Sequence, residues 1–295
     1  MLKLFFGCGY LGERVARRWK SAGHDVVVVS RSRERAEQFQ RDGYRAIVAD
    51  VTRPESLGNL PVADTVLFAV GYDRSTGAAG PSIEDVYAGG LRNVLAALPS
   101  QTGRFIYIST TGVYGFRSGE WVDEATPPDP HRSGGLASLA AEEVLGTSSL
   151  ANRAVILRLA GIYGPGRVPF LDELKSGQPI PARTAGFLNL IHVDDAVEAV
   201  VAAESADFNS FASQSTPHTF CVCDGNPVQR GEYYSEVARQ IGAPPPRFVE
   251  PEPGSPRADR AGSSRRVCND RMLADLRVTL GYPDYRAGLA AILSQ

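Results

Sequence analysis

The beginning of the chain changes from a continuous apolar run to a helical spacing of apolar residues. Residues 2–6 are all apolar except Lys3 and end at a glycine-rich stretch, residues 7–12. They are too few to form a helix before the glycines and predict a buried strand. After the glycines, apolar residues recur every four positions, as on one face of a helix: Leu11, Val15 and Trp19. The pattern therefore predicts strand, glycine turn and helix.

The glycine stretch has the spacing Gly7-x-Gly9-x-x-Gly12. In such a turn the first glycine permits a tight bend, the second lets a pyrophosphate approach the backbone, and the third lets the helix pack closely on the strand. The amide groups at the helix start, around Tyr10 and Leu11, then face the anion together with the positive end of the helix dipole. We therefore predict a dinucleotide-binding turn.

Strands and helices continue to alternate over the first 160 residues. Continuous apolar or β-branched runs predict strands over 24–30, 45–49, 64–70, 104–108 and 154–159, and helical patterns cover 34–41, 83–98 and 133–145. This order predicts an α/β fold of the Rossmann type, with a doubly wound parallel sheet. Ligands of such sheets bind beyond the carboxyl ends of the strands. The corresponding positions are Ser30-Arg31, Asp50-Val51, Ala69-Val70-Gly71 and Ser109-Thr110-Thr111.

The regular alternation stops after Gly161, and prolines punctuate the remainder. We predict a dinucleotide-binding domain over residues 1–165 that also receives the segment around 187–215. Residues 166–295 are expected to form mainly a smaller substrate-binding lobe. The polar stretch 112–132 is rich in Gly and Pro and long for an inert connection, which suggests a loop on the substrate side.

The end of the second predicted strand indicates which dinucleotide is preferred. NAD-specific sites carry an Asp or Glu there, which accepts hydrogen bonds from the ribose 2′-hydroxyl. This chain instead has Ser30 and Arg31, with Arg33 nearby. A hydroxyl and guanidinium groups suit a 2′-phosphate, so NADP is preferred over NAD. The alternative is that the arginines only cap the next helix or face solvent.

Composition excludes several classes of protein. The chain has 295 residues and a net charge of −2, which gives no reason to expect nucleic acid as a partner. The first strand follows Met1 directly, and no apolar run reaches the length of a membrane span, so we expect a cytoplasmic protein with no membrane partner. The four cysteines have no zinc spacing, and we expect no metal and reduced thiols. Cys8 is either a small residue filling the glycine turn or a redox-sensitive thiol at a helix start.

The chain resembles the extended short-chain dehydrogenase/reductases, the nucleotide-sugar epimerase/dehydratase group, nearly end to end. The motifs that carry the resemblance are Gly7-x-Gly9-x-x-Gly12, residues 108–115 (ISTTGVYG), residues 157–166 (LRLAGIYGPG) and residues 189–195 (NLIHVDD). The resemblance implies a cofactor domain, a substrate lobe, and a reaction centre made of a Ser or Thr with Tyr-x-x-x-Lys. It places the hydroxyl residue at Thr110 and Asp50 near the adenine.

The chain departs from that family at the reaction centre. The positions expected for Tyr and Lys hold Gly134 and Ser138, and Tyr87 stands where many members have Asn. Tyr114 and His131 flank the candidate loop and are candidate catalytic residues beside Thr110, since an imidazole suits proton exchange near neutral pH. His131 is otherwise an exposed loop residue.

Two further motifs have structural alternatives. His192 is expected to serve structure or to position the substrate lobe, and Asp194 or Asp195 to cap the following helix. The pair Arg265-Arg266 is expected to be solvated or to meet an acidic substrate.

Two functions follow from these observations. The first is an NADP-preferring oxidoreductase or epimerase-like enzyme that acts on a nucleotide sugar or a small polar carbonyl with a non-standard acid/base group. The second is a non-catalytic NADP-binding redox sensor or scaffold. A homodimer is expected in either case, because it is common in the resembled family.

Overall fold

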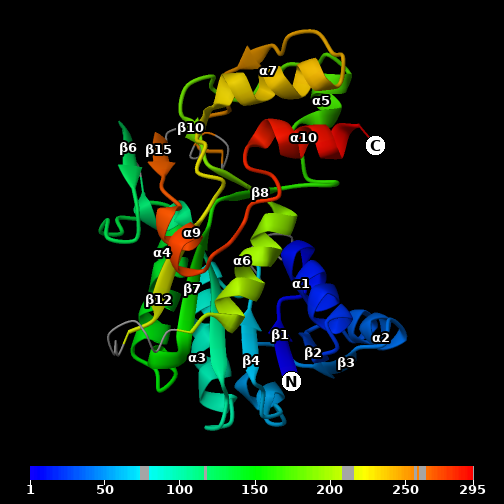
Figure 1. Ribbon diagram of the computed structural model, residues 1–295, viewed down its shortest axis with the longest axis vertical. Helices are drawn as coiled ribbons and strands as arrows, with labels where there is room; N and C mark the ends of the chain where they lie inside the picture. The colour runs from blue at the N-terminus through cyan, green and yellow to red at the C-terminus, as the bar shows by residue number, and fades with distance from the viewer. Residues whose placement is uncertain (74–79, 116–117, 208–215, 256–257, 259–263, 295) are drawn as a thin grey trace. The chain divides into compact units, whose positions relative to one another are not determined.

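The computed structural model describes residues 1–73, 80–115, 118–207, 216–255, 258 and 264–294 (Figure 1). The chain divides into two compact units, each assembled from three separate stretches. The first unit comprises Met1–Val113, Ser133–Arg158 and Val197–Phe220, and the second comprises Tyr114–Arg132, Leu159–Ala196 and Cys221–Gln295. Part of the predicted segment 187–215, residues 208–215, lies outside the described residues. The substrate-binding role predicted for residues 166–295 stays a prediction.

A seven-stranded sheet forms the centre of the first unit, in the order β12-β7-β5-β4-β1-β2-β3. Its strands are β1 Leu2–Phe6, β2 Asp25–Ser30, β3 Arg45–Val48, β4 Thr65–Phe68, β5 Arg104–Thr110, β7 Ala154–Leu159 and β12 His218–Val222. β1 pairs in parallel with both β2 and β4, and the order runs outward from β1 in both directions. This confirms the predicted doubly wound parallel sheet and places its switch point beside β1.

The helices of the first unit follow the strands as predicted, with one difference. They are α1 Tyr10–Ser21, α2 Arg33–Arg41, α3 Gly90–Ala97 and α4 Ser133–Gly146, and α6 Val193–Ser205 ends in this unit. The predicted helix over 83–98 is interrupted by a π-helical turn, η3 Asp85–Gly89. Such turns are rare and concentrate at functional sites.

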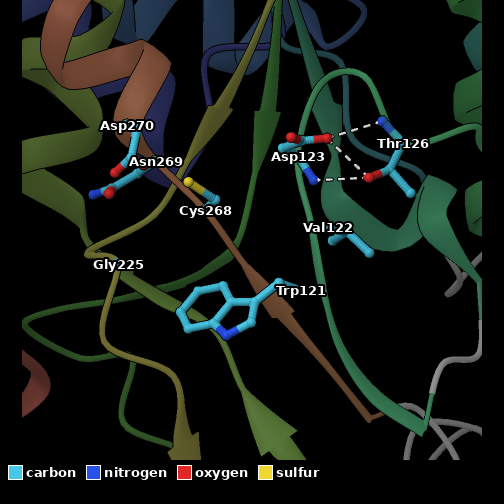
Figure 2. Close-up of a pocket in the computed structure, with 8 residues that line it drawn as sticks. All are labelled: Trp121, Val122, Asp123, Thr126, Gly225, Cys268, Asn269 and Asp270. Carbon is cyan, nitrogen blue, oxygen red and sulfur yellow. Dashed lines mark hydrogen bonds between the residues drawn. The ribbon is translucent and has the colours of Figure 1, made fainter.

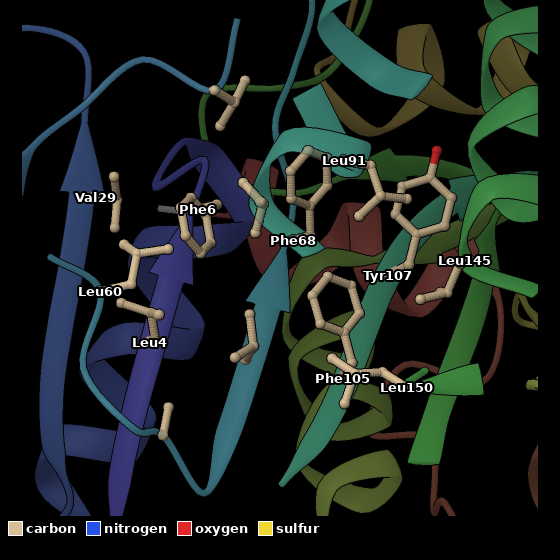
Figure 3. Packing of buried hydrophobic residues seen from close by; sticks show 14 of the residues in the cluster. Leu4, Phe6, Val29, Leu60, Phe68, Leu91, Phe105, Tyr107, Leu145 and Leu150 are labelled. Atoms are coloured by element: carbon tan, nitrogen blue, oxygen red, sulfur yellow. The ribbon is translucent and has the colours of Figure 1, made fainter. Parts of the chain in front are cut away.

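Alternate residues of the central strands point to one face of the sheet and form the main core of the first unit. Leu4, Phe6, Phe68 and Phe105 are fully buried there and meet residues of α3 and α4 such as Leu145 (Figure 3). Full burial of each such side chain contributes about 1.5–3 kcal/mol to the stability of the fold. The continuous apolar strands therefore stabilise the sheet that carries the predicted cofactor residues.

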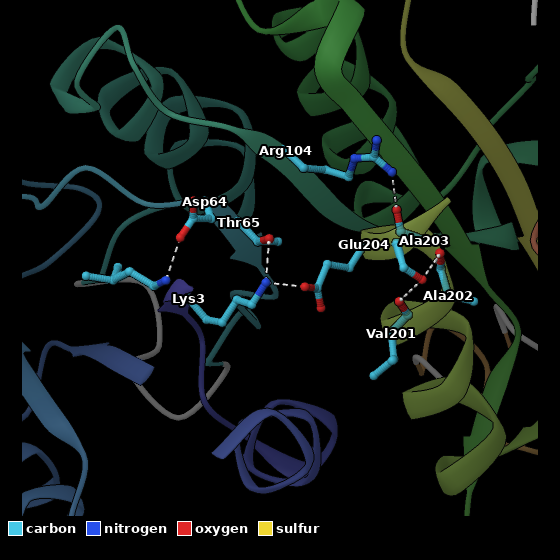
Figure 4. Close-up of polar contacts among 10 residues, drawn as sticks. Lys3, Asp64, Thr65, Arg104, Val201, Ala202, Ala203 and Glu204 are labelled. Carbon is cyan, nitrogen blue, oxygen red and sulfur yellow. Dashed lines mark hydrogen bonds and ion pairs between the residues drawn. The ribbon is translucent and has the colours of Figure 1, made fainter. Parts of the chain in front are cut away.

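A buried lysine joins the start of the sheet to the end of α6 within the first unit. Lys3 is fully buried, and its Nζ lies 3.0 Å from Thr65 Oγ1 and forms an ion pair with Glu204 (Figure 4). Beside it, Arg104 Nη1 donates to the carbonyl oxygens of Ala203 and Ala206 at 2.8 and 2.7 Å. Carbonyls at a helix end have no partner within the helix, so these bonds complete α6.

The second unit consists of short paired strands and helices. The pairs are β6 Ser118–Val122 with β15 Ser264–Val267, β8 Gly161–Tyr163 with β11 Leu190–His192, β9 Ile180–Pro181 with β14 Phe248–Val249, and β10 Phe187–Leu188 with β13 Val228–Gln229. The helices are α5 Leu171–Lys175, α7 Arg230–Gln240, α9 Asp270–Asp275 and α10 Tyr285–Leu293. The predicted loop 112–132 thus contains a strand, and its residues 116–117 lie outside the described part.

The motif at residues 189–195 holds other segments of the second unit in place. Asp195 accepts the backbone N–H groups of Gly281 and Tyr282 at 2.7 and 3.0 Å. The ring of His192, which is almost fully buried, packs on the ring of Tyr282 with centroids 3.7 Å apart. Asn189 accepts the N–H of Val267 at 2.7 Å and so binds β15. These contacts give the motif a structural role.

Candidate functional site

The three glycines of the turn have different surroundings in the first unit. Gly7 has φ +85°, and a Cβ there would lie 2.3 Å from the carbonyl oxygen of Ala69. A Cβ on Gly12 would lie 2.7 Å from the carbonyl oxygen of Gly7. A Cβ on Gly9 would meet nothing within 4 Å. Packing therefore requires the first and third glycines, while open space lies beside the second.

No side chain accepts a capping hydrogen bond from the first amide groups of the helix that follows the turn. Gly9 is the N-cap residue of α1, and no side chain caps the helix there. The carbonyl of Gly9 accepts the N–H of Glu13 at 2.8 Å, which starts the helix directly after the turn. The N–H groups of Tyr10 and Leu11 thus belong to the first turn, which carries the positive end of the helix dipole. Open space at Gly9 and an uncapped helix start fit a pyrophosphate group.

The end of β2 carries hydroxyl and guanidinium groups and no carboxylate, in agreement with the sequence. Arg31 Nη2 lies 2.5 Å from Asp73 Oδ2, with both side chains partly exposed. Ser30 Oγ accepts the N–H of Ser32 at 3.3 Å. Ser32 caps α2 by accepting the N–H of Arg35 at 3.2 Å, and Arg33 is exposed in the first turn of the helix.

A further arginine, Arg35, contacts the glycine turn itself. Its Nη2 donates to the carbonyl oxygen of Cys8 at 2.8 Å, and it forms an ion pair with Glu13 of α1. Arg35 is not among the cofactor residues that the sequence predicts. Its position three residues after the N-cap Ser32 was a usable signal, because that places it in the first turn of a helix beginning at the rim of the sheet. Arg31 and Arg35 thus provide two guanidinium groups at this end of the first unit.

Cys8 fills the glycine turn as a small buried residue. Burial raises the pKa of the Cys8 thiol to about 12, and the charge of Glu13 adds to this effect. The thiolate is therefore scarcely present near neutral pH, which argues against the redox-sensitive alternative.

Two neighbouring rim positions have mainly local contacts. Asp50 Oδ1 accepts hydrogen bonds from the N–H of Thr52 at 2.9 Å and from its hydroxyl at 2.8 Å. Val51 is buried, and its carbonyl oxygen accepts Asn93 Nδ2 at 2.8 Å. A Cβ on Gly90 would lie 2.7 Å from Val51 Cγ2, so α3 packs directly on this position. Their predicted cofactor contacts stay predictions.

Thr110 ends β5 with its hydroxyl at the rim. Its Oγ1 accepts the N–H of Gly112 at 3.0 Å, and the side chain is half-buried. The preceding residue, Ser109, donates to Glu142 Oε1 at 2.5 Å. Adjacent residues of a strand point to opposite faces, so Thr110 points away from the buried Glu142. The hydroxyl retains a proton to donate to a ligand.

The positions where the resemblance expects Tyr and Lys are occupied differently in α4. A Cβ on Gly134 would have only Ile83 Cδ1 near it, at 3.9 Å. Ser138 is buried and hydrogen-bonded to the phenol of Tyr107, whose pKa is raised, chiefly by burial. On the neighbouring π turn, the hydroxyl oxygen of Tyr87 accepts the N–H of Tyr72 at 3.3 Å. The Tyr87 phenol therefore lies beside the backbone of Tyr72, in the loop after β4.

The other two predicted catalytic residues, Tyr114 and His131, belong to the second unit. Tyr114 is fully buried, and its hydroxyl lies 3.1 Å from Cys221 Sγ. His131 is exposed, with Nε2 3.9 Å from Asp129 Oδ2. The expectation of a solvated Arg265 is wrong, because Arg265 is buried and donates from Nη1 to the carbonyl oxygen of Gly115 at 2.9 Å. The catalytic roles of Tyr114 and His131 stay predictions.

The second unit also contains an open cleft of about 440 Å³ (Figure 2). It is lined by side chains of β6, of the loop after it, and of the segment between β15 and α9, including Trp121, Asp123, Asn269 and Asp270. Across residues 1–73, 80–115, 118–207, 216–255, 258 and 264–294, no three or more His, Cys, Asp or Glu side chains are grouped so that they could hold a metal ion. In the same part of the chain no helix combines the length and the apolar character needed to cross a membrane.

Comparisons with known proteins agree with this geometry. The profile of the NAD dependent epimerase/dehydratase family matches residues 7–210. Protein YeeZ of Escherichia coli is 28% identical over 284 residues, which cover 94% of this chain and 95% of YeeZ. A 3-diazoavenalumate denitrifying reductase of Streptomyces is 30% identical over 186 residues, 57% of this chain and 58% of the reductase. The UDP-glucose 4-epimerase of Thermotoga maritima, solved with UDP-glucose, has a TM-score of 0.81 at 18% identity over 100% of this chain and 98% of the epimerase, and so shares the fold.

Proposed function

The chain belongs to the NAD-dependent epimerase/dehydratase family of extended short-chain dehydrogenase/reductases, and from this premise we propose that it is an NADP-preferring enzyme. Its substrate is a nucleotide sugar or a small polar carbonyl compound, and its acid/base group is non-standard. The observation that carries the proposal is the open space at Gly9, bordered by the uncapped start of α1 and by Arg35 on the Cys8 carbonyl.

The preference for NADP rests on charge at the end of β2. A carboxylate at that position would repel a 2′-phosphate, and the chain has Ser30 there instead. Arg31 and Arg35 supply guanidinium groups that form charge-assisted, bidentate hydrogen bonds with phosphate. Each is paired with a partly exposed carboxylate, Asp73 or Glu13, and exposed pairs of this kind are weak enough to exchange for a phosphate.

The bound dinucleotide supplies hydride transfer at its nicotinamide ring. Thr110 is proposed to polarise the reacting carbonyl or alcohol through its hydroxyl proton. For the proton that the reaction moves, we add Tyr87 to the candidates Tyr114 and His131. Its oxygen accepts the Tyr72 N–H, so its own proton is directed elsewhere, and Gly134 leaves space on the facing helix. A positioned proton donor accelerates such a step about 10²- to 10⁴-fold.

A second function is favoured by a specific observation. Ser138 is bonded to the buried Tyr107 and Gly134 has no side chain, so α4 does not supply the Tyr–Lys pair that the resemblance expects. A protein that binds NADP without turnover, as a redox sensor or scaffold, would also explain this arrangement.

One experiment tests both functions. Calorimetric titration with NADPH and NADH is made on the wild type and on Arg31→Ala, Arg33→Ala and Arg35→Ala, with Arg41→Ala at the far end of α2 as the control. We expect tighter binding of NADPH, weakened about 10-fold or more by Arg31→Ala or Arg35→Ala, because a hydrogen bond to a charged group contributes about 1.5–3 kcal/mol. Equal affinity for NADH would refute the NADP preference, and binding of neither dinucleotide would refute both functions.

Turnover then separates the enzyme from the sensor. Small aldehydes and ketones are offered with NADPH, and UDP-glucose with NADP⁺, on the wild type, Thr110→Val and Tyr87→Phe. Nicotinamide absorbance reports net oxidation or reduction, and chromatography of the sugar nucleotide reports epimerisation, which leaves the dinucleotide unchanged overall. Turnover that is lost in either variant, with dinucleotide binding intact, supports the enzyme and the role of that residue. Tight binding with no turnover on any compound supports the sensor.

A further inference from the structure

The cleft of the second unit has the chemistry of a ligand site that is independent of the dinucleotide. Its lining combines one large aromatic ring with oxygen acceptors and contains no lysine or arginine. Its volume, about 440 Å³, lies in the range of small-molecule sites. From this lining we propose that the cleft binds a small primary ammonium ion with a compact apolar body.

The aromatic wall of the cleft is an unusually exposed tryptophan. Trp121 is 51% exposed, and its indole faces the cleft below Cys268 (Figure 2). The guanidinium carbon of Arg266 lies 5.1 Å from the ring centroid of Trp121 and 5.3 Å from that of Phe187. Arg266 Nε also donates to the carbonyl oxygen of Gly119 at 2.7 Å. Arg266 is therefore fixed and holds the indole in place, so the ring is oriented before a ligand arrives.

The polar wall presents an acceptor carried by a largely buried side chain. Asn269 is 6% exposed, and its Nδ2 donates to the carbonyl oxygen of Cys223 at 2.8 Å. Asn269 is the N-cap residue of α9, yet its side chain makes no capping hydrogen bond. Within the described part of the chain, its Oδ1 accepts no hydrogen bond, and it lines the cleft next to Gly225. The Nδ2 bond fixes the side chain, and its Oδ1, which solvent in the cleft can reach, is a positioned acceptor for a ligand that donates an N–H or O–H.

Two carboxylates give the cleft a negative charge. Asp123 receives the N–H and hydroxyl of Thr126 on Oδ1 at 3.0 and 2.9 Å, which fixes the carboxylate and leaves Oδ2 toward solvent. Asp270 is exposed, and the thiol of Cys268 donates a hydrogen bond to it. Burial and this carboxylate raise the pKa of Cys268, so the thiol stays neutral. The charges lining the cleft are therefore those of Asp123 and Asp270.

These groups together select the chemical class of the ligand. Both carboxylates would repel an anionic ligand. A neutral ligand that only accepts hydrogen bonds would find few donor groups in the lining of the cleft. An ammonium group donates up to three hydrogen bonds and carries the opposite charge, so it suits Asn269 Oδ1 and the carboxylate of Asp270. An apolar body attached to it would cover the exposed indole of Trp121.

The test uses cyclohexylmethylammonium and its neutral counterpart, cyclohexylmethanol, on the full chain. The protein has two tryptophans, and Trp19 is buried in the core of the first unit. A change in tryptophan fluorescence on titration therefore reports on Trp121, and Trp121→Phe identifies the signal. We expect saturable binding of the ammonium, at least about 10-fold weaker binding of the alcohol, and weaker binding at high salt, which screens exposed charges.

Calorimetry on two variants connects the binding to the cleft. Asp270→Asn keeps the shape of an exposed side chain and is expected to weaken ammonium binding about 10-fold. Glu250→Gln removes an exposed carboxylate that pairs with Arg183 elsewhere in the second unit, and it should leave the affinity unchanged. Circular dichroism checks that both variants are folded. Equal binding of ammonium and alcohol, an unaffected Asp270→Asn variant, or no binding of either compound would overturn the proposal.

Discussion

Arg158 and Glu142 face each other inside the first unit, with Arg158 Nη2 2.6 Å from Glu142 Oε2 and both side chains more than nine-tenths buried. Arg158 Nε also donates to Glu142 Oε1 at 3.1 Å, and Ser109 donates to the same oxygen at 2.5 Å. The pair joins β7 and α4 beside the strand that ends in Thr110. It fixes α4, the helix on which the resemblance expects Tyr and Lys.

Removing one member of this pair should destabilise the fold strongly. Glu142→Gln keeps the size of the side chain but removes the negative charge that lies 2.6 Å from the buried Arg158 guanidinium, which lowers the free energy of unfolding by about 3–5 kcal/mol. The double variant Glu142→Leu with Arg158→Met should recover much of that loss, because no charge is then buried. Urea unfolding followed by circular dichroism measures both. A single variant within about 1 kcal/mol of the wild type would contradict this account.

Substitutions at two glycines of the cofactor turn should have different effects, one on the stability of the fold and the other on dinucleotide binding. Gly7→Ala forces a Cβ against the Ala69 carbonyl at a positive φ, so the variant should lose several kcal/mol of stability or fail to fold. Gly9→Ala adds a methyl group to open space at φ −99°, so its unfolding free energy should change by less than about 1 kcal/mol. The same methyl group would occupy the space proposed for the pyrophosphate. Thermal unfolding and NADPH calorimetry on Gly9→Ala check the pair of expectations, and unchanged NADPH affinity would place the phosphates elsewhere.

Asp224 in the second unit should make stability depend on pH. Burial raises the pKa of Asp224 from 3.8 to about 7, and the charges of Asp284 and Asp195 add to the shift. Its Oδ2 is buried and has no hydrogen-bond partner among the described residues. The folded state therefore binds a proton that the unfolded chain releases above pH 4. The contribution of this group to stability is complete below pH 4 and is lost progressively as pH rises to about 7, with a total of about 4 kcal/mol at most.

The variant Asp224→Asn isolates this contribution. Its neutral amide cannot ionise, so its stability relative to the wild type should rise between pH 4 and pH 7 and stay constant above that range. Urea unfolding across the pH range measures the difference, with Asp129→Asn, at an exposed carboxylate, as the control. A pH-independent difference would show that Asp224 ionises normally in the folded protein.

The sheet could be predicted from sequence because its strands are buried on both faces and therefore consist of continuous apolar runs. Strand β2, with four consecutive valines, is a clear case. The strands of the second unit are two to five residues long, and their partners come from distant segments, as in β6 with β15. No local pattern identifies such pairs, so the sequence predicts a loop where β6 lies. The π turn at Asp85–Gly89 likewise keeps a helical pattern of side chains and differs only in its backbone bonds.

The candidate site was predictable where a backbone conformation requires a residue type. Gly7 and Gly12 are such positions, since packing excludes a side chain at both. Contacts made by the ends of long side chains were not predictable. Arg35 reaches the Cys8 carbonyl across two elements, and Arg265 extends inward to the Gly115 carbonyl, although both look like surface residues in the sequence. Their partners depend on packing that a linear pattern does not contain.

The division of the chain into interleaved stretches has a consequence for its biosynthesis. The first unit includes residues up to Phe220, whereas the second unit begins at Tyr114. The second unit therefore starts to emerge from the ribosome before the first unit is complete. The amino-terminal strands therefore lack part of their own unit until residue 220 has been translated. Such incomplete intermediates are prone to aggregate, so chaperone assistance during synthesis should matter more for this protein than for one with two successive domains.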